Sequence, residues 1–400
     1  MITIALPGAP QRPQPEAGAD DMRVLSVTPF PLLPTSHGSR ARAWGFAHGM
    51  ALAGATVDVI CPWTPPFPMR AVSSEGVTIH RHLLPANLLP LVVSERLVPP
   101  LVMLSWQPFA AGPRRLLSRF RGYDVVEFHL CATANWMGKE PRGARVVYVA
   151  HNVERDFHRL VPRTKLASGP AMRALDRLEA RAVAASDLIV TCTEADAARL
   201  RELDGTTTPM LVVPQASDVR GGPGPEARAA VRRQLGIADD ELALVFVGGP
   251  AHHNRSAVAY LEDEVLPRLR RPARLLAVGR CADGNGGAPS GRTLRLGYVD
   301  DVAPLLAAAD VGVNPITAGS GTNCKVALYL AAGLPTLTTP IGLRGYEPMA
   351  SECMVAELDR FADVLDAVPL RDASAARPTA VPDWRAAGAT LLAAYERLLA

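Results

Sequence analysis

The sequence is poor in several features that would place it in a specialised class of protein. Only 5% of its residues are aromatic, its formal net charge at pH 7 is +3, and its 6 cysteines stand singly, without a CxxC pair. A net charge so close to zero does not indicate a nucleic-acid partner. Scattered single cysteines form neither a metal-ligand spacing nor a disulfide framework, and they indicate reduced thiols in a cytoplasmic protein.

Long hydrophobic runs are also missing. The best candidate for a membrane span, residues 83–104, contains four prolines as well as Glu95 and Arg96. A spanning helix needs about 18 apolar residues in succession, so this segment is not expected to cross a membrane. Residues 1–21 lack the charged and apolar regions of a signal peptide and are expected to form a disordered leader.

What the sequence contains is an alternation of short apolar runs with helical patterns. The runs cover residues 23–29, 55–61, 124–128, 145–150, 187–192 and 210–214, and then 242–248, 274–279, 293–297, 311–315 and 335–339. Helical patterns lie at about 40–52 and 169–185, and a last one covers residues 382–399. Apolar strands separated by helices predict parallel sheets that are covered on both faces.

The chain length and a break in the alternation predict two domains. A chain of 400 residues exceeds one typical domain, and the stretch SDVRGGPGPE at 217–226 breaks the alternation. We therefore expect an N-terminal Rossmann-like domain over 22–216 and a C-terminal one over 217–380. The remaining residues, 381–400, are expected to form a helix that can cross back to the first domain.

A glycine-rich loop, GSGTN at 319–323, precedes a helix expected to begin at about Asn323. The free N–H groups of a first helical turn and the helix dipole form an anion site. Gly319 and Gly321 would let the backbone approach a phosphate closely. Taken alone, the loop is equally consistent with a strand-to-helix turn that binds nothing.

Seven segments together resemble one enzyme family. SGTNCK followed by YLAAGLPTLTTPIG, within 320–342, resembles the donor-site motif of the retaining GT-B glycosyltransferases of family 4 (group 1 type). The other segments follow in the family's order: PTSHGSRAR at 34–42, HNVE at 151–154, LIVTCTE at 188–194, VVPQASD at 212–218, FVGGPAHHN at 246–254 and LGYVDDVAPLLAAAD at 296–310.

The resemblance implies an α/β protein of GT-B fold, with two Rossmann-like domains whose parallel sheets face each other across a cleft. The C-terminal domain would bind a nucleotide-diphosphate-sugar, and the N-terminal domain a hydroxyl-bearing acceptor such as a glycan, a lipid-linked sugar or a natural product. The sugar would be transferred with retention of configuration. The resemblance also implies no metal ion and no cofactor apart from the nucleotide-sugar itself.

The same resemblance assigns candidate site residues. His151 is the catalytic candidate because it follows a strand pattern, and parallel sheets bind ligands at the carboxyl ends of their strands. His129 and Arg40 are candidates for the acceptor side. The donor-binding candidates are Gly38, Arg255, Gly319, Ser320, Gly321, Thr322, Asn323 and Lys325. Structural histidines and surface cations remain open alternatives, and the pair His252 and His253 indicates a polar loop rather than a metal site.

Two positions depart from the family pattern. Leu328 stands where many members have a glutamate that binds the ribose, and Arg344 stands where an acidic residue is usual. Loss of a charge-assisted ribose contact costs about 1.5–3 kcal/mol. Other groups, with Glu347 as one candidate, then hold the ribose, or the donor differs, or the chain is a catalytically impaired auxiliary or sugar-binding subunit. A sugar-nucleotide epimerase or an oxidoreductase is disfavoured because no GxGxxG follows the first strand.

A cluster of basic and apolar residues precedes the strand at 124–128. Its members are Trp106, Phe109, Arg114, Arg115, Leu116, Leu117, Arg119 and Arg121. Such a surface is compatible with peripheral contact with an anionic membrane, on its inner face, or with a charged or lipid-linked acceptor. A solvated basic helix face is the alternative.

Overall fold

The structure is a computed structural model. It describes residues 21–33, 35, 38–62, 71–82, 116–138, 140, 142–160, 170–219, 224–283, 291–318, 321–372 and 380–400. The site candidates Gly319 and Ser320 lie outside the described residues, as do Trp106, Phe109, Arg114 and Arg115.

The first domain is built on an eight-stranded sheet with the order β3-β4-β2-β1-β5-β6-β7-β8. Its strands are β1 (Arg23–Val27), β2 (Thr56–Pro62), β3 (Val72–Ser74), β4 (Val77–His82), β5 (Val125–His129), β6 (Arg145–Val149), β7 (Leu188–Thr191) and β8 (Met210–Val212). Its helices are α1 (Gly38–Leu52), α5 (Glu154–Leu160), α6 (Pro170–Ala184) and α7 (Glu194–Asp204). The strand pairs are parallel except β3 with β4, which is antiparallel.

The second domain has a six-stranded parallel sheet with the order β11-β10-β9-β12-β13-β14. Its strands are β9 (Leu242–Val247), β10 (Ala273–Val278), β11 (Thr293–Gly297), β12 (Val311–Asn314), β13 (Thr336–Thr338) and β14 (Cys353–Val355). Its helices are α8 (Gly224–Gln234), α9 (His252–Tyr260), α10 (Ala303–Ala308), α11 (Cys324–Ala331) and α12 (Phe361–Ala367).

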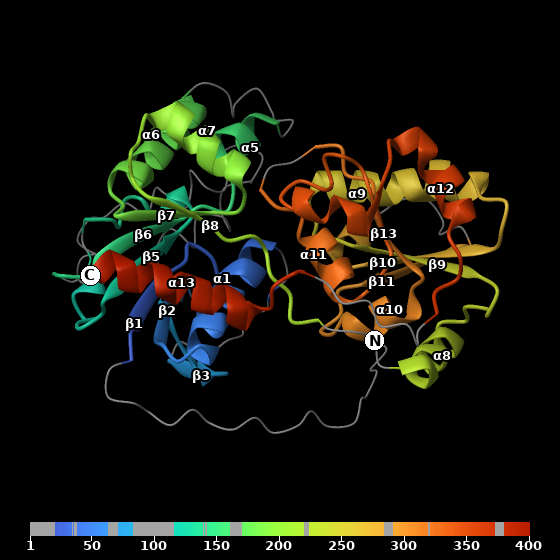
Figure 1. The fold of residues 1–400 in the computed structure, drawn as a ribbon, viewed down its shortest axis with the longest axis horizontal. Helices are drawn as coiled ribbons and strands as arrows, with labels where there is room; N and C mark the ends of the chain where they lie inside the picture. The colour runs from blue at the N-terminus through green and yellow to red at the C-terminus, as the bar shows by residue number, and fades with distance from the viewer. Residues whose placement is uncertain are drawn as a thin grey trace.

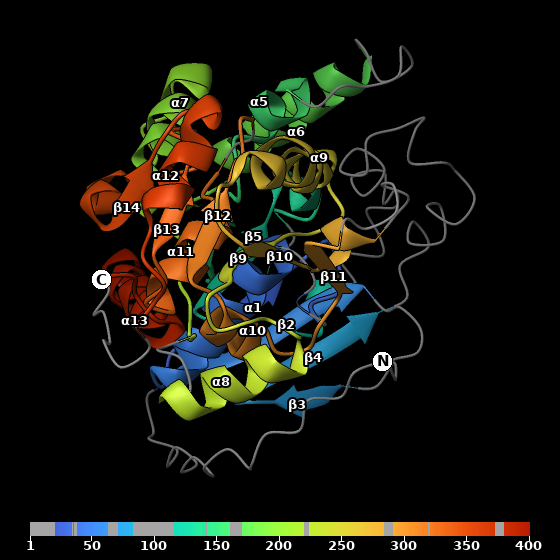
Figure 2. The same ribbon diagram turned by 90° about the vertical axis from the view of Figure 1, so that its right-hand side faces the viewer.

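Alternate residues of β9 show how this second sheet is covered on both faces. Leu244 and Phe246 pack into one apolar cluster with residues of α9 and α12, whereas Ala243 and Val245 pack into another with residues of α10. Figures 1 and 2 show the same layers, with α9 and α12 on one side of the sheet and α8 and α10 on the other. The predicted α/β architecture of two parallel-sheet domains is confirmed.

Each predicted strand is present, with ends within one or two residues of the expected ones. The sequence did not predict β3, β4 and β14. Two of these are only three residues long, and β4 (VTIHRH) carries polar residues at alternate positions. Strands this short or this polar give no continuous apolar run.

The last helix, α13 (Trp384–Leu399), packs against α1 of the first domain, as Figure 1 shows. The two helices touch backbone to backbone: a Cβ atom added to Gly388 would lie 2.1 Å from the carbonyl carbon of Gly49. The chain therefore passes from the first domain to the second and returns.

The two crossing segments lie side by side. The N–H of Ser217 donates to the carbonyl of Pro382 at 3.1 Å, and the N–H of Trp384 donates to the Asp218 carboxylate at 3.0 Å. The domain boundaries at 216/217 and 380/381 remain predictions.

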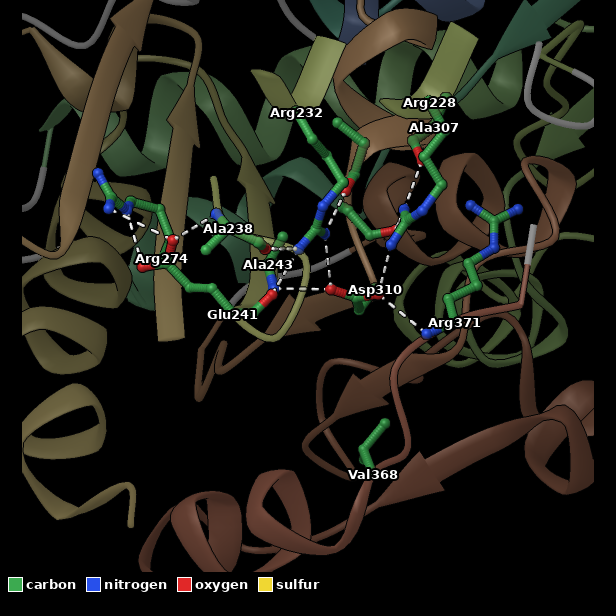
Figure 3. Close-up of polar contacts among 12 residues, drawn as sticks. Arg228, Arg232, Ala238, Glu241, Ala243, Arg274, Ala307, Asp310, Val368 and Arg371 are labelled. Carbon is green, nitrogen blue, oxygen red and sulfur yellow. Dashed lines mark hydrogen bonds and ion pairs between the residues drawn. The ribbon is translucent and has the colours of Figure 1, made fainter. Parts of the chain in front are cut away.

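A buried aspartate connects several elements at the end of the second sheet that lies away from the carboxyl ends of its strands (Figure 3). Asp310 directly precedes β12 and is fully buried. Its carboxylate accepts hydrogen bonds from Arg228 (2.5 Å) and Arg232 (3.0 Å) of α8. It also accepts the backbone N–H groups of Ala243 (2.8 Å) and Arg371 (2.9 Å). This network fixes α8 and the chain leaving the domain against the sheet, and its position indicates a structural role.

Within the described part of the chain, no helix combines the length and the apolar character that crossing a membrane requires. Leu116 and Leu117, which the sequence assigns to a surface cluster, are buried in the core of the first domain. That part of the expected membrane-facing surface is therefore wrong, because a buried leucine cannot contact lipid.

Candidate active site

A cavity of about 1040 Å3 lies between the two domains. Its walls include residues at the carboxyl ends of β6, β9 and β10, where parallel sheets bind their ligands. Of the sequence-predicted residues, it brings together Gly38, His151, Gly321, Thr322, Asn323 and Lys325. These residues come from both domains.

The loop before α11 touches the first domain at the HNVE segment. Gly321 has φ = +67°, and an added Cβ atom would lie 2.6 Å from the carbonyl oxygen of His151 and 2.5 Å from the Asn152 side-chain oxygen. Both the positive φ and the close approach require glycine. Gly38, which begins α1, lies close to the first residue of α11, since its added Cβ atom would be 2.9 Å from the sulfur of Cys324.

Lys325 supplies a partly buried cation in the first turn of α11. Its ammonium group lies 5.2 Å from the centre of the Phe246 ring, and burial lowers its pKa to about 8. His253 lines the same cavity, and burial, followed by the positive charge of Lys325, lowers its pKa to about 4. At neutral pH the lysine is therefore charged and the histidine is neutral.

His151 forms the floor of the cavity and is backed by a second histidine. Its side chain is buried, and its Nε2 atom lies 3.0 Å from Nδ1 of His129. His129 is fully buried and is not part of the cavity wall. Its predicted contact with an acceptor would therefore have to pass through His151.

Two other predicted cations lie outside the cavity wall. Arg255 is exposed on α9, and Arg40 is half-buried on α1. Burial lowers the pKa of Arg40, while the nearby groups of Cys61 and Tyr298 oppose this shift. Tyr298 belongs to the second domain, so Arg40 lies near the cleft; ligand contacts for both arginines remain predictions.

Comparison with known proteins assigns the family. Residues 37–216 match the family model described as glycosyl transferase 4-like domain, and residues 241–368 match the model described as glycosyl transferases group 1. The two matches take in most of both domains. The chain belongs to the group 1 glycosyltransferases.

Curated relatives carry one recurring description. The D-inositol 3-phosphate glycosyltransferase of Actinosynnema mirum is 31% identical over 257 residues, which are 60% of this chain and 58% of that protein. The protein of the same description from Segniliparus rotundus is 28% identical over 297 residues, 70% of this chain and 60% of that protein. The chain thus spans between half and two thirds of the length of these relatives.

Solved structures show the shared GT-B fold. Sucrose-phosphate synthase from Thermosynechococcus elongatus has a TM-score of 0.70 at 16% identity, and the match covers 94% of this chain and 99% of that one. Anabaena Alr3699/HepE in complex with UDP and glucose has a TM-score of 0.62 at 14% identity, with 94% and 99% covered. WaaG, a glycosyltransferase involved in lipopolysaccharide biosynthesis, has a TM-score of 0.59 at 18% identity, with 94% of each chain covered.

Both departures of this chain from the family pattern lie in the cavity wall. Leu328 packs against an apolar cluster of the second domain and presents no hydrogen-bonding group to the cavity. A guanidinium nitrogen of Arg344 lies 3.7 Å from the carboxylate of Asp196 on α7, which forms an ion pair between the domains. Glu347 accepts the N–H of Gly345 at 3.0 Å and does not belong to the cavity wall.

The sequence did not single out two further residues of the cavity wall. Arg42 is buried and donates to the carbonyls of Thr191 (3.3 Å) and Val213 (2.8 Å), so it joins α1 to the ends of β7 and β8. Tyr298, which follows β11, is 45% exposed at the rim. Arg42 lies within the PTSHGSRAR motif, but nothing in that motif distinguishes it from Arg40.

No group of three or more His, Cys, Asp or Glu side chains within the described ranges could hold a metal ion. His252 and His253 therefore form no such cluster with other described residues.

Proposed function

We propose that the chain transfers a sugar from a nucleotide-diphosphate-sugar to a hydroxyl group of an acceptor, with retention of configuration. The observation that carries this proposal is the interdomain cavity, which combines His151 with the partly buried cation Lys325 and the N-terminus of α11. We also propose that the reaction needs neither a metal ion nor a cofactor apart from the donor.

The proposed reaction requires stabilisation of negative charge on the leaving group. When the bond between the sugar and the diphosphate breaks, negative charge develops on the departing phosphate. A helix N-terminus and a cation in a site of low polarity stabilise that charge more strongly than water-exposed groups do. Lys325, with a pKa of about 8, still carries its proton at neutral pH. The diphosphate would lie against residues 320–323 and Lys325, with Gly38 opposite.

The relatives suggest which substrates to test first. Several are described as D-inositol 3-phosphate glycosyltransferases, and Alr3699/HepE was solved with UDP-glucose. We propose a UDP-sugar as the first donor and a phosphorylated cyclitol as the first acceptor, ahead of glycans, lipid-linked sugars and natural products. The anomeric configuration of the product, measured by NMR, tests retention.

A thermal-shift series tests the donor site directly. The purified chain is heated with UDP, GDP, TDP, ADP or CDP in the presence of EDTA, and we expect one diphosphate to raise the melting temperature. Gly321→Ala should abolish this shift, because its Cβ atom would collide with the HNVE segment. Gly236→Ala is the matched control, since Gly236 has φ = +66° with nothing within 4 Å of an added Cβ atom.

The absence of a shift with every nucleotide at millimolar concentration would contradict the proposal. The preferred function would then be a second candidate, that of a sugar-binding or auxiliary subunit without catalytic activity. Leu328 favours that candidate because it removes a hydrogen-bonding side chain from the cavity wall. Nucleotide binding without transfer to any acceptor would support it.

We further propose a cytoplasmic location with peripheral contact with an anionic membrane. With Leu116 and Leu117 buried, this contact depends on the exposed side chains of Arg119 and Arg121. Co-sedimentation with anionic vesicles but not with neutral ones is the expected result. Equal recovery with both would contradict it.

A further inference from the structure

A hydrogen-bonded chain of buried side chains runs from the last helix to the floor of the cavity. The hydroxyl of Tyr395 on α13 donates to Oε1 of Glu127 at 2.5 Å. Oε2 of the same carboxyl accepts from the hydroxyl of Ser26 on β1 and lies 3.4 Å from Nε2 of His129. Nδ1 of His129 lies 3.0 Å from Nε2 of His151. Of these five side chains, the cavity reaches only His151.

Glu127 is fully buried yet has partners suited to an ionised carboxylate. Burial by itself raises the pKa of Glu127, but its hydrogen bonds, chiefly with His129, outweigh burial and lower this pKa below its ordinary value. An ionised carboxylate only accepts hydrogen bonds. Tyr395, Ser26 and His129 must therefore all act as donors toward it.

When His129 is neutral, this requirement determines the protons further along the chain; a charged imidazolium would instead donate from both ring nitrogens. If Nε2 of neutral His129 carries the proton that faces Glu127, its Nδ1 atom is an acceptor. His151 must then donate through Nε2, and its Nδ1 atom carries no proton. An uncharged amide in place of Glu127 would remove the constraint, because its NH2 group can donate to Nε2 of His129 and reverse the proton positions of His129 and His151, while its oxygen still accepts from Tyr395.

We propose that Glu127, His129 and Tyr395 are positioning residues that hold His151 in one tautomer and one orientation at the floor of the cavity. Tyr395 makes the last helix part of this arrangement, although α13 follows the donor-binding domain in the chain. The consequence for catalysis rests on the proposed function, in which His151 faces the transferred sugar. The tautomer of His151 does not depend on the proposed function, so the tautomer and the catalytic role can be tested separately.

Long-range proton–nitrogen NMR spectra of the protein with 15N-labelled histidine report the tautomer of each ring. The chain has 9 histidines, and His151→Gln identifies the signals of His151. In the wild-type protein we expect His151 as the Nε2–H tautomer. In Glu127→Gln we expect the Nδ1–H form or a mixture. In Tyr395→Phe we expect a smaller shift of the His151 signals in the same direction, because the lost hydroxyl is one of the donors that lower the pKa of Glu127 and so favour its ionised form.

Tyr148→Phe is the matched control. Tyr148 is a fully buried tyrosine on β6, the strand beside β5, and its hydroxyl has no hydrogen-bond partner among the described residues. Its loss should leave the His151 signals unchanged. Unchanged His151 signals in a folded Glu127→Gln or Tyr395→Phe protein would overturn the proposal. Tyr395→Phe removes a single hydroxyl group, so it decides the question even if Glu127→Gln fails to fold.

Activity gives the second measurement. Glu127→Gln should lower kcat by about 10- to 100-fold, taking as a guide the range found when the hydrogen-bond partners of metal-binding histidines are removed. Its affinity for the nucleotide should not change, since Glu127 lies outside the cavity wall. An equal loss of nucleotide affinity would indicate a general structural defect and would overturn the positioning role. If the chain transfers no sugar at all, the proposed function fails, while the NMR result still decides the tautomer.

Discussion

At the scale of single residues, Lys325 places a partly buried positive charge in the cavity wall. Its pKa of about 8 means that it loses its proton within an accessible pH range. Because a diphosphate favours the protonated form, nucleotide affinity should fall as the pH rises above 8, by up to about tenfold per pH unit. Titration calorimetry between pH 7 and 9.5 measures this change. His253 stays neutral throughout, with its pKa of about 4.

Lys325→Arg is the control for this prediction, because a guanidinium keeps its charge over the whole range. Its nucleotide affinity should be independent of pH, even if the larger side chain weakens binding. A wild-type affinity that is flat from pH 7 to 9.5 would show that Lys325 does not contact the diphosphate.

The sequence could assign to the candidate site only residues that lie in local motifs beside predicted strand ends or helix starts. Gly321, Lys325 and His151 lie in motifs next to predicted strand ends or helix starts, and the structure brings them to one cavity. The hydrogen bond between Tyr395 and Glu127, by contrast, joins residues that are 268 positions apart in the sequence. No local pattern reports such a contact, since it depends on how α13 packs against the first domain.

At the scale of elements, the contact between α1 and α13 depends on glycine. Gly388→Ala should destabilise the protein, because the added Cβ atom would overlap the backbone of Gly49. This result would oppose the usual effect, since alanine stabilises a helix by about 1 kcal/mol relative to glycine. Overpacking of this kind typically costs about 1–3 kcal/mol. Urea unfolding followed by circular dichroism measures the difference.

Thr390→Ala provides the comparison on the same helix. Thr390 is exposed, so its replacement should leave stability unchanged or slightly higher. If Gly388→Ala also proved stabilising, the two helices would be packed less closely than the structure indicates. The sequence predicted a last helix that can cross back to the first domain, but not that two glycines would mark the contact.

At the scale of the whole molecule, the cavity draws its walls from two domains that must close to form it. Contacts of Gly321 with His151 and of Arg344 with Asp196 exist only when the domains are together. We expect a saturating nucleotide to reduce the radius of gyration in small-angle X-ray scattering, since it adds contacts to both walls. A profile that is unchanged by a nucleotide known to bind would contradict ligand-induced closure.

The paired crossings between the domains also determine which movements are possible. A single flexible connection would let one domain swivel freely about the other. Here two segments are tied by the bonds of Ser217 to Pro382 and of Trp384 to Asp218, so twisting would have to break them. Bending about the line through both crossings preserves them. An opening motion that keeps both bonds therefore separates the cavity walls without displacing Ser217 and Asp218 from Pro382 and Trp384.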